Sequence, residues 1–142
     1  MCAPDAAVFT YGSLMIPRVM EAVCGRTFDA LDALLQGYAR YALRGETYPG
    51  LVPEDAVATE GVLWQGVDAD SLRRLDVFEG DWYTRESVTV LTGAGSEELA
   101  CEAQTYVLVP AQHFRVSRRR WSRDRFETRY LQRFLSSYVR DA

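Results

Sequence analysis

The stretch VFTYGSLMIPRVMEAVCG, residues 8–25, decides how the fold begins. Its opening VFTY consists of β-branched and aromatic residues, which is typical of a buried strand, and Gly12 follows directly. Pro17 stands where a helix can begin, and Gly25 stands where that helix can end. The stretch therefore predicts a strand, a tight glycine turn and a helix over residues 17–24.

The rest of the chain shows one more clear helical pattern among several strand patterns. Apolar residues recur at helical spacing after Asp68 or Asp70, either of which can cap a helix. Gly80 ends this pattern, so Glu79 is predicted to be the last residue of the helix. Strands are predicted over residues 8–11, 28–43 in one piece or in two that divide near Gly37, 57–67, 83–91 and 100–109.

Glycines and prolines mark the expected loops. Residues 45–55 contain two glycines and two prolines and predict a loop. Gly93-Ala94-Gly95 predicts the turn of a hairpin, and Pro110 is expected to close the sheet region.

The tail of the chain predicts a final helix. Ser122 is its expected N-terminal cap, and Trp121 is expected to pack on Phe126 as a hydrophobic staple. The apolar face of this helix comprises Phe126, Tyr130, Leu131, Phe134, Leu135 and Tyr138.

Length and composition indicate the class of protein. A chain of 142 residues suits one domain covering residues 1–142. Hydrophobic residues make up 48% and charged residues 25%, which is typical of a soluble globular protein and excludes a disordered or fibrous chain. No apolar run approaches the length of about 18 residues that a membrane span needs, and no basic region precedes the apolar stretch near the N-terminus. We therefore expect a cytoplasmic protein without a membrane partner.

Several chemistries are excluded by the residue types that are scarce. All 16 basic residues are arginine, so Schiff-base and P-loop chemistry through lysine are excluded. Cys2, Cys24 and Cys101 are too few and too far apart for a disulfide framework or a zinc site, and His113 is the only histidine. We expect reduced cysteines, no metal, no cofactor, and acid–base chemistry from carboxylates or tyrosines.

The first candidate site is the turn Tyr11-Gly12-Ser13-Leu14. A glycine directly after a strand lets the chain turn sharply and expose successive backbone N–H groups, and such groups bind carboxylates. A plain strand-to-helix turn without a ligand is the alternative interpretation.

The second candidate site is Glu79. The negative end of a helix dipole, the apolar neighbours Phe78 and Trp82, and the nearby carboxylates of Asp76 and Asp81 would all raise its pKa. A carboxyl group tuned in this way can exchange protons near neutral pH. The alternative is a solvated glutamate at a helix end.

The motifs together resemble the gamma-glutamyl cyclotransferase-like family. The resemblance rests on VFTYGSLM near the N-terminus, YPGLVP near residue 50, Gly61 inside a strand, LDVFEGDWYTR in mid-chain and AQTYV shortly after it. It spans roughly residues 8–138, because WSRDRFETRYLQRFL is similar to the family's final helix. The specific parts are the opening YGSL and the central D-x-F-E-G-x-x-Y-x-R pattern.

The resemblance implies an α+β fold, a compact mixed sheet like a barrel with flanking helices and one pocket. It also implies an enzyme that cyclises a gamma-glutamyl group to 5-oxoproline and releases an amine or amino acid. By position, Tyr11, Gly12, Ser13 and Leu14 would hold the α-amino-carboxylate end of the substrate. Glu79 would be the general acid/base, and Tyr106 would line the pocket.

Other residues near these motifs have open roles. Tyr83 and Arg85 lie two apart on a strand and hence on the same face, where they either orient Glu79 or simply pack. Tyr83 is included among the substrate-binding candidates, while Arg85 would lower the pKa of Glu79 if it were its charge partner. Tyr48 and Arg40 are candidate rim residues, and no role is assigned to His113.

Two alternatives to an enzyme remain at this point. A protein that binds small ligands or a partner with the same pocket, without turnover, fits the same motifs, because a fold does not fix an activity. Eight arginines between Arg115 and Arg133 could form a patch for RNA or another acidic partner. The interspersed Asp124 and Glu127 and the net charge of −4 favour a solvated surface instead, so no nucleic acid is expected.

Overall fold

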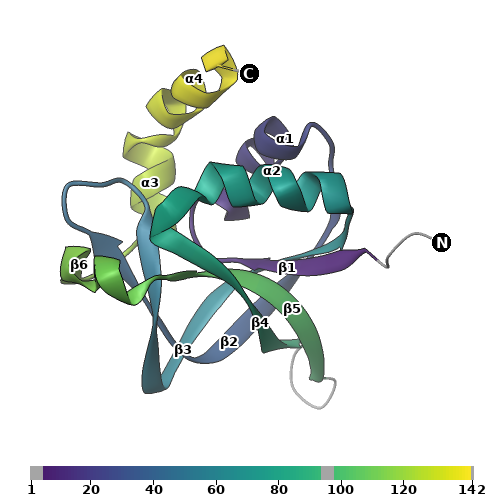
Figure 1. Cartoon of the computed structure of the whole chain (residues 1–142), viewed down its shortest axis with the longest axis vertical. Helices are drawn as coiled ribbons and strands as arrows, with labels where there is room; N and C mark the ends of the chain where they lie inside the picture. The colour runs from purple at the N-terminus through teal and green to yellow at the C-terminus, as the bar shows by residue number, and fades with distance from the viewer. Residues whose placement is uncertain (1–4, 94–97, 142) are drawn as a thin grey trace.

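The structure is a computed structural model that describes residues 5–93 and 98–141, with side chains described as far as residue 137. A mixed sheet carries helices on one side (Figure 1). In chain order the elements are β1 (Ala6–Thr10), η1 (Ser13–Met15), α1 (Pro17–Cys24), β2 (Asp29–Leu43), β3 (Pro49–Val67), α2 (Ala69–Glu79), η2 (Gly80–Trp82), β4 (Tyr83–Thr92), β5 (Leu99–Leu108), η4 (Pro110–Arg115), β6 (Val116–Arg120), α3 (Arg123–Arg129) and α4 (Leu131–Asp141).

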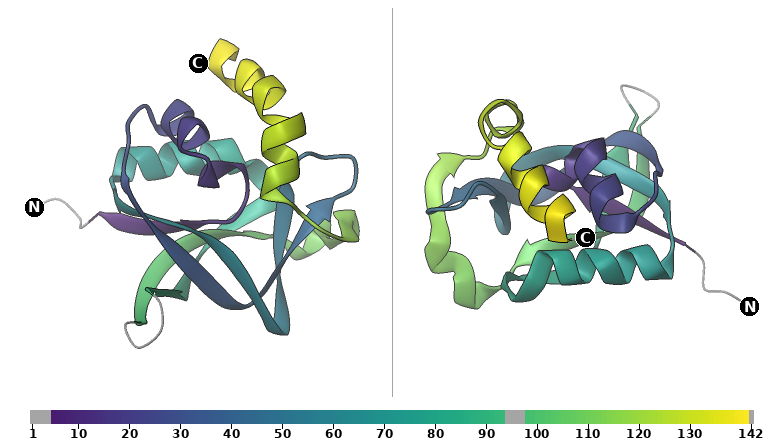
Figure 2. Two further views of the ribbon diagram at one scale, coloured as in Figure 1. Left: turned by 180° about the vertical axis from the view of Figure 1, so that it is seen from behind. Right: turned by 90° about the horizontal axis from the view of Figure 1, so that it is seen from above.

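The sheet closes partly into a ring. Its strand order is β3-β1-β5-β4-β2-β6, and β3 also pairs with β2. β1 runs parallel to β5, whereas β2 and β3 form a long antiparallel pair. Helices α1 and α2 lie next to each other across one end of this ring, and α3 and α4 stand beside them (Figure 2). The predicted α+β class, a barrel-like mixed sheet with flanking helices, is confirmed.

Two clusters of buried side chains fill the molecule on either side of β1. Val8 belongs to a cluster that joins the sheet to the helices, where it lies with residues such as Leu75 and Phe126. Phe9, the next residue, belongs to a cluster contributed by the strands, with Leu35 and others. Successive residues of a strand point to opposite faces, so β1 separates the two clusters. Its end at Thr10 therefore lies between strands and helices, where a pocket can form.

Close approach of β3 to β1 depends on Gly61. A Cβ atom at this position would overlap the Thr10 carbonyl oxygen and would lie 2.6 Å from Phe9 Cζ. Only a residue without a side chain fits between these atoms. Gly61 thus allows β3 to lie directly against the end of β1.

The predicted helix boundaries agree well with the structure. α1 covers the predicted residues, and α2 ends at Glu79. Asp68 caps α2 by accepting a 3.2 Å hydrogen bond from the Ser71 N–H. Ser122 caps α3 in the same way, and the Trp121 and Phe126 rings lie 5.7 Å apart, as the staple requires.

The predicted loop over residues 45–55 is correct for residues 45–48 and wrong from Pro49 onward. β3 begins at Pro49 and pairs with β2, with Pro49 opposite Ala42. Proline is tolerated as the first residue of a strand, and Gly50 serves close packing, since a Cβ there would lie 2.9 Å from the Leu43 side chain. Residues typical of turns thus stand inside a strand. β2, by contrast, is a single strand whose register shifts between Gln36 and Tyr38.

The C-terminal third also departs from the prediction. Pro110 does not close the sheet, because it opens the short helix η4 and β6 then pairs with β2. The expected final helix is divided at Tyr130 into α3 and α4. Ala94 and Gly95 of the predicted hairpin turn, and the side chain of Tyr138, lie outside the described residues.

Candidate active site

The turn after β1 opens the short helix η1. The Met15 N–H donates to the Gly12 carbonyl oxygen at 3.0 Å, and the Ile16 N–H donates to the Ser13 carbonyl oxygen at 3.1 Å. The N–H groups of Gly12, Ser13 and Leu14 precede these bonds and take no part in them, as is usual at the start of a helix. Such groups suit a carboxylate ligand.

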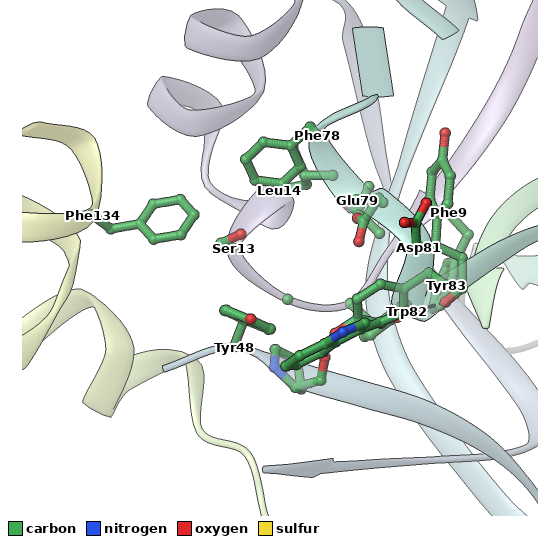
Figure 3. Close-up of a pocket in the computed structure, with 16 residues that line it drawn as sticks. Phe9, Ser13, Leu14, Tyr48, Phe78, Glu79, Asp81, Trp82, Tyr83 and Phe134 are labelled. Atoms are coloured by element: carbon green, nitrogen blue, oxygen red, sulfur yellow. Dashed lines mark hydrogen bonds between the residues drawn. The ribbon is translucent and has the colours of Figure 1, made fainter. Parts of the chain in front are cut away.

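Glu79 reaches the same region from the end of α2. Gly80 has a φ of 76°, which ends the helix directly after Glu79. The Glu79 side chain lies among the residues that surround a cavity beside the Ser13 turn (Figure 3). Two segments that are far apart in the sequence therefore meet at one cavity.

This cavity, called the β1–α2 cavity below, has a volume of about 240 Å³. Aromatic side chains supply half of its lining residues. It is lined by Phe9, Thr10, Tyr11, Gly12, Ser13, Leu14, Tyr48, Pro49, Phe78, Glu79, Gly80, Asp81, Trp82, Tyr83, Tyr106 and Phe134. Every residue predicted for the site is among them, including Tyr83 and Tyr106.

The Glu79 carboxyl group is tuned by its surroundings. Burial, followed by the charge of Asp76, raises the pKa of Glu79 from 4.5 to about 8. None of the ion pairs between described residues includes Glu79, so no cation offsets these effects. A carboxyl group with such a pKa is present in both protonation states near neutral pH, which suits it to transfer protons.

Three tyrosines hold the cavity wall through hydrogen bonds to the protein. The Tyr11 hydroxyl donates to the Tyr106 carbonyl oxygen at 2.5 Å, and the Tyr83 hydroxyl donates to the Pro49 carbonyl oxygen at 2.7 Å. The Tyr106 hydroxyl donates to Asp76 Oδ1 at 2.6 Å. Burial raises the pKa of all three phenols, so they remain neutral hydrogen-bond donors.

Arg85 does not pair with Glu79. Its Nε atom lies 3.0 Å from Asp76 Oδ1, and its Nη1 atom donates to Gln104 Oε1 at 3.3 Å. The ion pair with Asp76 explains why the guanidinium does not keep the pKa of Glu79 low. Tyr83 and Arg85, predicted to share a face, therefore have different partners.

Of the remaining candidate residues, Tyr48 lies at the cavity, and Arg40 and His113 lie outside it. Tyr48 lines it, and its ring centroid is 6.2 Å from that of Trp82. Arg40 lies outside and donates to the Tyr11 carbonyl oxygen at 2.9 Å. His113 is exposed on η4, where its Nε2 atom is 3.2 Å from the Leu108 carbonyl oxygen.

The arginine-rich segment lies on a short strand and on the helices around it. Arg118, Arg119 and Arg120 lie on β6 and are exposed, and the remaining arginines lie on η4, α3 and α4. Arg115 is placed differently, with its guanidinium carbon 3.8 Å from the Trp82 ring centroid. One arginine of the segment thus packs on an aromatic residue of the cavity wall.

Sequence reasoning missed some lining residues. Phe134 was predicted only as part of an apolar helix face, yet it lines the cavity from α4. Phe9 and Pro49, predicted only as a strand residue and a loop residue, also line the cavity. The resemblance in YPGLVP was the one signal that pointed to Pro49, whereas no local pattern distinguishes Phe134 from a core residue.

Within residues 5–93 and 98–141, no group of three or more His, Cys, Asp or Glu side chains is arranged to hold a metal ion. Nor does that part of the chain contain a helix of the length and apolar character that a membrane span needs.

Comparisons with known proteins identify the family of this chain. Residues 8–123 match the model of the family described as gamma-glutamyl cyclotransferase, AIG2-like. The chain is 40% identical to Protein AIG2 C of Arabidopsis thaliana over 102 residues, which are 72% of this chain and 61% of that protein. The chain thus spans about three fifths of the length of that relative.

Solved structures share the fold. A solution structure of an Arabidopsis thaliana protein is similar with a TM-score of 0.72 and 31% identity, covering 99% of this chain and 84% of the other. A yeast gamma-glutamyl cyclotransferase specific to glutathione aligns with a TM-score of 0.64 and 14% identity over 82% of this chain and 74% of the other, a likeness of fold alone. The extent of the family match, which includes both the Tyr11 turn and Glu79, shows that this chain belongs to the gamma-glutamyl cyclotransferase, AIG2-like family.

Proposed function

We propose that this protein is a gamma-glutamyl cyclotransferase that needs no cofactor. Its substrate would be a small gamma-glutamyl amide, and its products would be 5-oxoproline and a free amine or amino acid. The proposal rests chiefly on one observation, a Glu79 carboxyl group with a pKa near 8 on the wall of the cavity that the Tyr11–Leu14 turn also lines. We further propose that residues 1–142 act as a single domain in the cytoplasm.

The reaction needs orientation and the movement of two protons away from the α-nitrogen. The α-nitrogen of the glutamyl group must meet its own γ-carbonyl carbon, and holding a flexible chain in this curled form is worth up to about 7 to 11 kcal/mol. The backbone N–H groups of Gly12, Ser13 and Leu14 would bind the α-carboxylate at one end. The aromatic walls would enclose the rest of the glutamyl chain.

Glu79 would move both protons. As a carboxylate it would accept a proton from the α-ammonium group, and the freed amine would form a bond to the γ-carbon. As a carboxylic acid it would then donate that proton to the leaving nitrogen while the old carbon–nitrogen bond breaks. The regenerated carboxylate would accept the second proton from the ring nitrogen, which becomes the neutral N–H of 5-oxoproline, and would pass it to the released amine or to water. General acid–base catalysis of this kind contributes about 10² to 10⁴ in rate.

A panel of gamma-glutamyl amines, amino acids and peptides tests the proposal. Purified protein should release 5-oxoproline from at least one of them, and Glu79→Gln should remove this activity while the fold is retained. Glu86→Gln, the same change at an exposed position on β4, is the matched control and should leave the rate unchanged. Thermal stabilisation by glutamate-like ligands without any product would favour the alternative of a binding protein.

A further inference from the structure

The peptide that joins Tyr11 to Gly12 is held from outside the cavity by Arg40. Nη1 of Arg40 donates to the Tyr11 carbonyl oxygen at 2.9 Å and to the Glu60 carbonyl oxygen at 3.0 Å. Arg40 belongs to β2 and is half-buried. It lines a separate hollow that also includes Met15, and the described lining of the β1–α2 cavity does not include it.

The direction of this carbonyl fixes the direction of the Gly12 N–H. In a trans peptide unit the C=O and N–H groups lie in one plane and point in opposite directions. The Tyr11 carbonyl points toward the Arg40 guanidinium, which also binds the Glu60 carbonyl of β3. β5 lies on the other side of β1, and its Tyr106 lines the cavity together with Gly12. The Gly12 N–H therefore points away from the Arg40 guanidinium, and Gly12 itself lines the cavity.

The peptide has little freedom to rotate away from this direction. A Cβ atom on Gly12 would lie 2.9 Å from Pro49 Cδ, so the backbone already fits tightly against this wall. The guanidinium carbon of Arg40 lies 5.5 Å from the Trp121 ring centroid, and the Trp121 indole is itself fixed by a 2.8 Å hydrogen bond to the Thr47 carbonyl oxygen. A cation bound to the carbonyl also polarises the peptide and strengthens its N–H as a donor.

We propose that Arg40 is a positioning residue, which holds the Tyr11–Gly12 peptide so that the Gly12 N–H binds the α-carboxylate of a glutamyl ligand. The identity of this ligand rests on the proposed function. Among the described residues, no arginine lines the cavity, so a carboxylate in the turn meets backbone N–H donors in front and the charge of Arg40 behind the peptide. Arg40 thus acts through the backbone without touching the ligand.

A pair of ligands separates this role from general support of the fold. 5-Oxoproline carries the carboxylate, whereas 2-pyrrolidinone is the same ring without it. The dissociation constants of both are measured by calorimetry or ligand-observed NMR with the wild-type protein and with Arg40→Met, which keeps the stem and removes the donors. Arg40→Met should weaken 5-oxoproline binding about tenfold or more and leave 2-pyrrolidinone binding unchanged. The reason is that the Gly12 N–H would no longer be held in place for its hydrogen bond to the charged carboxylate.

The control is an arginine with the same kind of contact elsewhere. Nη1 of Arg74 donates to the Cys24 carbonyl oxygen at 3.3 Å, away from the cavity. Arg74→Met should therefore change neither dissociation constant. Arg40→Lys keeps the charge with fewer donors and should give 5-oxoproline binding between the wild type and Arg40→Met. It also serves as the test variant if Arg40→Met does not fold.

The outcomes distinguish this inference from the proposed function. Unchanged 5-oxoproline binding in folded Arg40→Met, or an equal loss for both ligands, overturns the role of Arg40. If the wild type binds the two ligands equally, the turn does not recognise a carboxylate and the inference also fails. If the wild type turns over no gamma-glutamyl compound but loses 5-oxoproline selectively in Arg40→Met, the proposed function fails and the role of Arg40 stands.

Discussion

The Tyr106 hydroxyl donates a 2.6 Å hydrogen bond to Asp76 Oδ1, one helical turn before Glu79. The Asp76 carboxylate is close enough to raise the pKa of Glu79. Its hydrogen bond also orients the Tyr106 ring, which lines the cavity. A change at Asp76 should therefore affect both the position of the Tyr106 ring and the protonation of Glu79.

Asp76→Asn should shift the pH dependence of activity to lower pH. The amide oxygen can still accept the bond from Tyr106, but the charge that raises the pKa of Glu79 is gone. If the Glu79 carboxylate starts the reaction, kcat/KM of the wild type rises with pH up to about 8, and this limb moves down in the variant. A pH profile of kcat/KM measures the shift, and an unmoved limb would count against Asp76.

Arg85→Gln should shift the rising limb of the kcat/KM profile to higher pH. Its Nε atom lies 3.0 Å from Asp76 Oδ1, so its removal leaves the Asp76 charge uncompensated and favours the protonated form of Glu79. Arg73→Gln is the matched control, because Arg73 forms a similar 3.1 Å ion pair with Asp70 on the same helix. Equal profiles for the Arg85 and Arg73 variants would show that the Asp76 ion pair does not tune the site.

The stability of the folded protein should depend on pH through Glu79. Its pKa is 4.5 without burial and about 8 in the fold, so the folded state binds more protons than the unfolded chain between these pH values. The contribution of Glu79 to stability therefore falls as pH rises through this window.

Glu79→Gln removes this dependence, because an amide does not ionise. The difference in free energy of unfolding between the variant and the wild type should grow in favour of the variant from pH 4.5 to about 8 and then level off. Urea denaturation across this range measures it. A difference that stays constant with pH would mean that the folded state does not retain the proton.

Gly61→Ala should destabilise the fold by at least about 1 to 3 kcal/mol, which is usual for an overpacked core. The added methyl group would overlap the Thr10 carbonyl oxygen and approach Phe9, so β1 or β3 must move. Gly66→Asn is the control, since Gly66 has open space around it and asparagine tolerates its φ of 67°. Chemical denaturation compares them, and equal effects would show that close packing at Gly61 is not required.

The sequence predicted the elements whose ends carry local signals. Pro17 and Gly25 bound α1, and Asp68 and Gly80 bound α2, because caps and helix stops depend on a few neighbouring residues. This was enough to place Glu79 at a helix end, from which the family resemblance suggested its role.

Features that depend on long-range contacts could not be predicted. Pro49 and Gly50 look like loop residues, yet both lie in β3, where Leu43 and Leu108 leave little room for a side chain at Gly50. In the same way, Arg85 stands near Glu79 in the sequence but pairs with Asp76. The pairing partners of charged side chains depend on the tertiary fold rather than on spacing along the chain.

The central claim is that the Glu79 carboxyl group transfers the proton in a gamma-glutamyl cyclisation. Release of 5-oxoproline from the best gamma-glutamyl compound of the panel, compared between wild type and folded Glu79→Gln at saturating substrate, tests it most directly. The rate should fall by about 10² to 10⁴, while binding of 5-oxoproline remains measurable. Equal rates for the two proteins would contradict the claim.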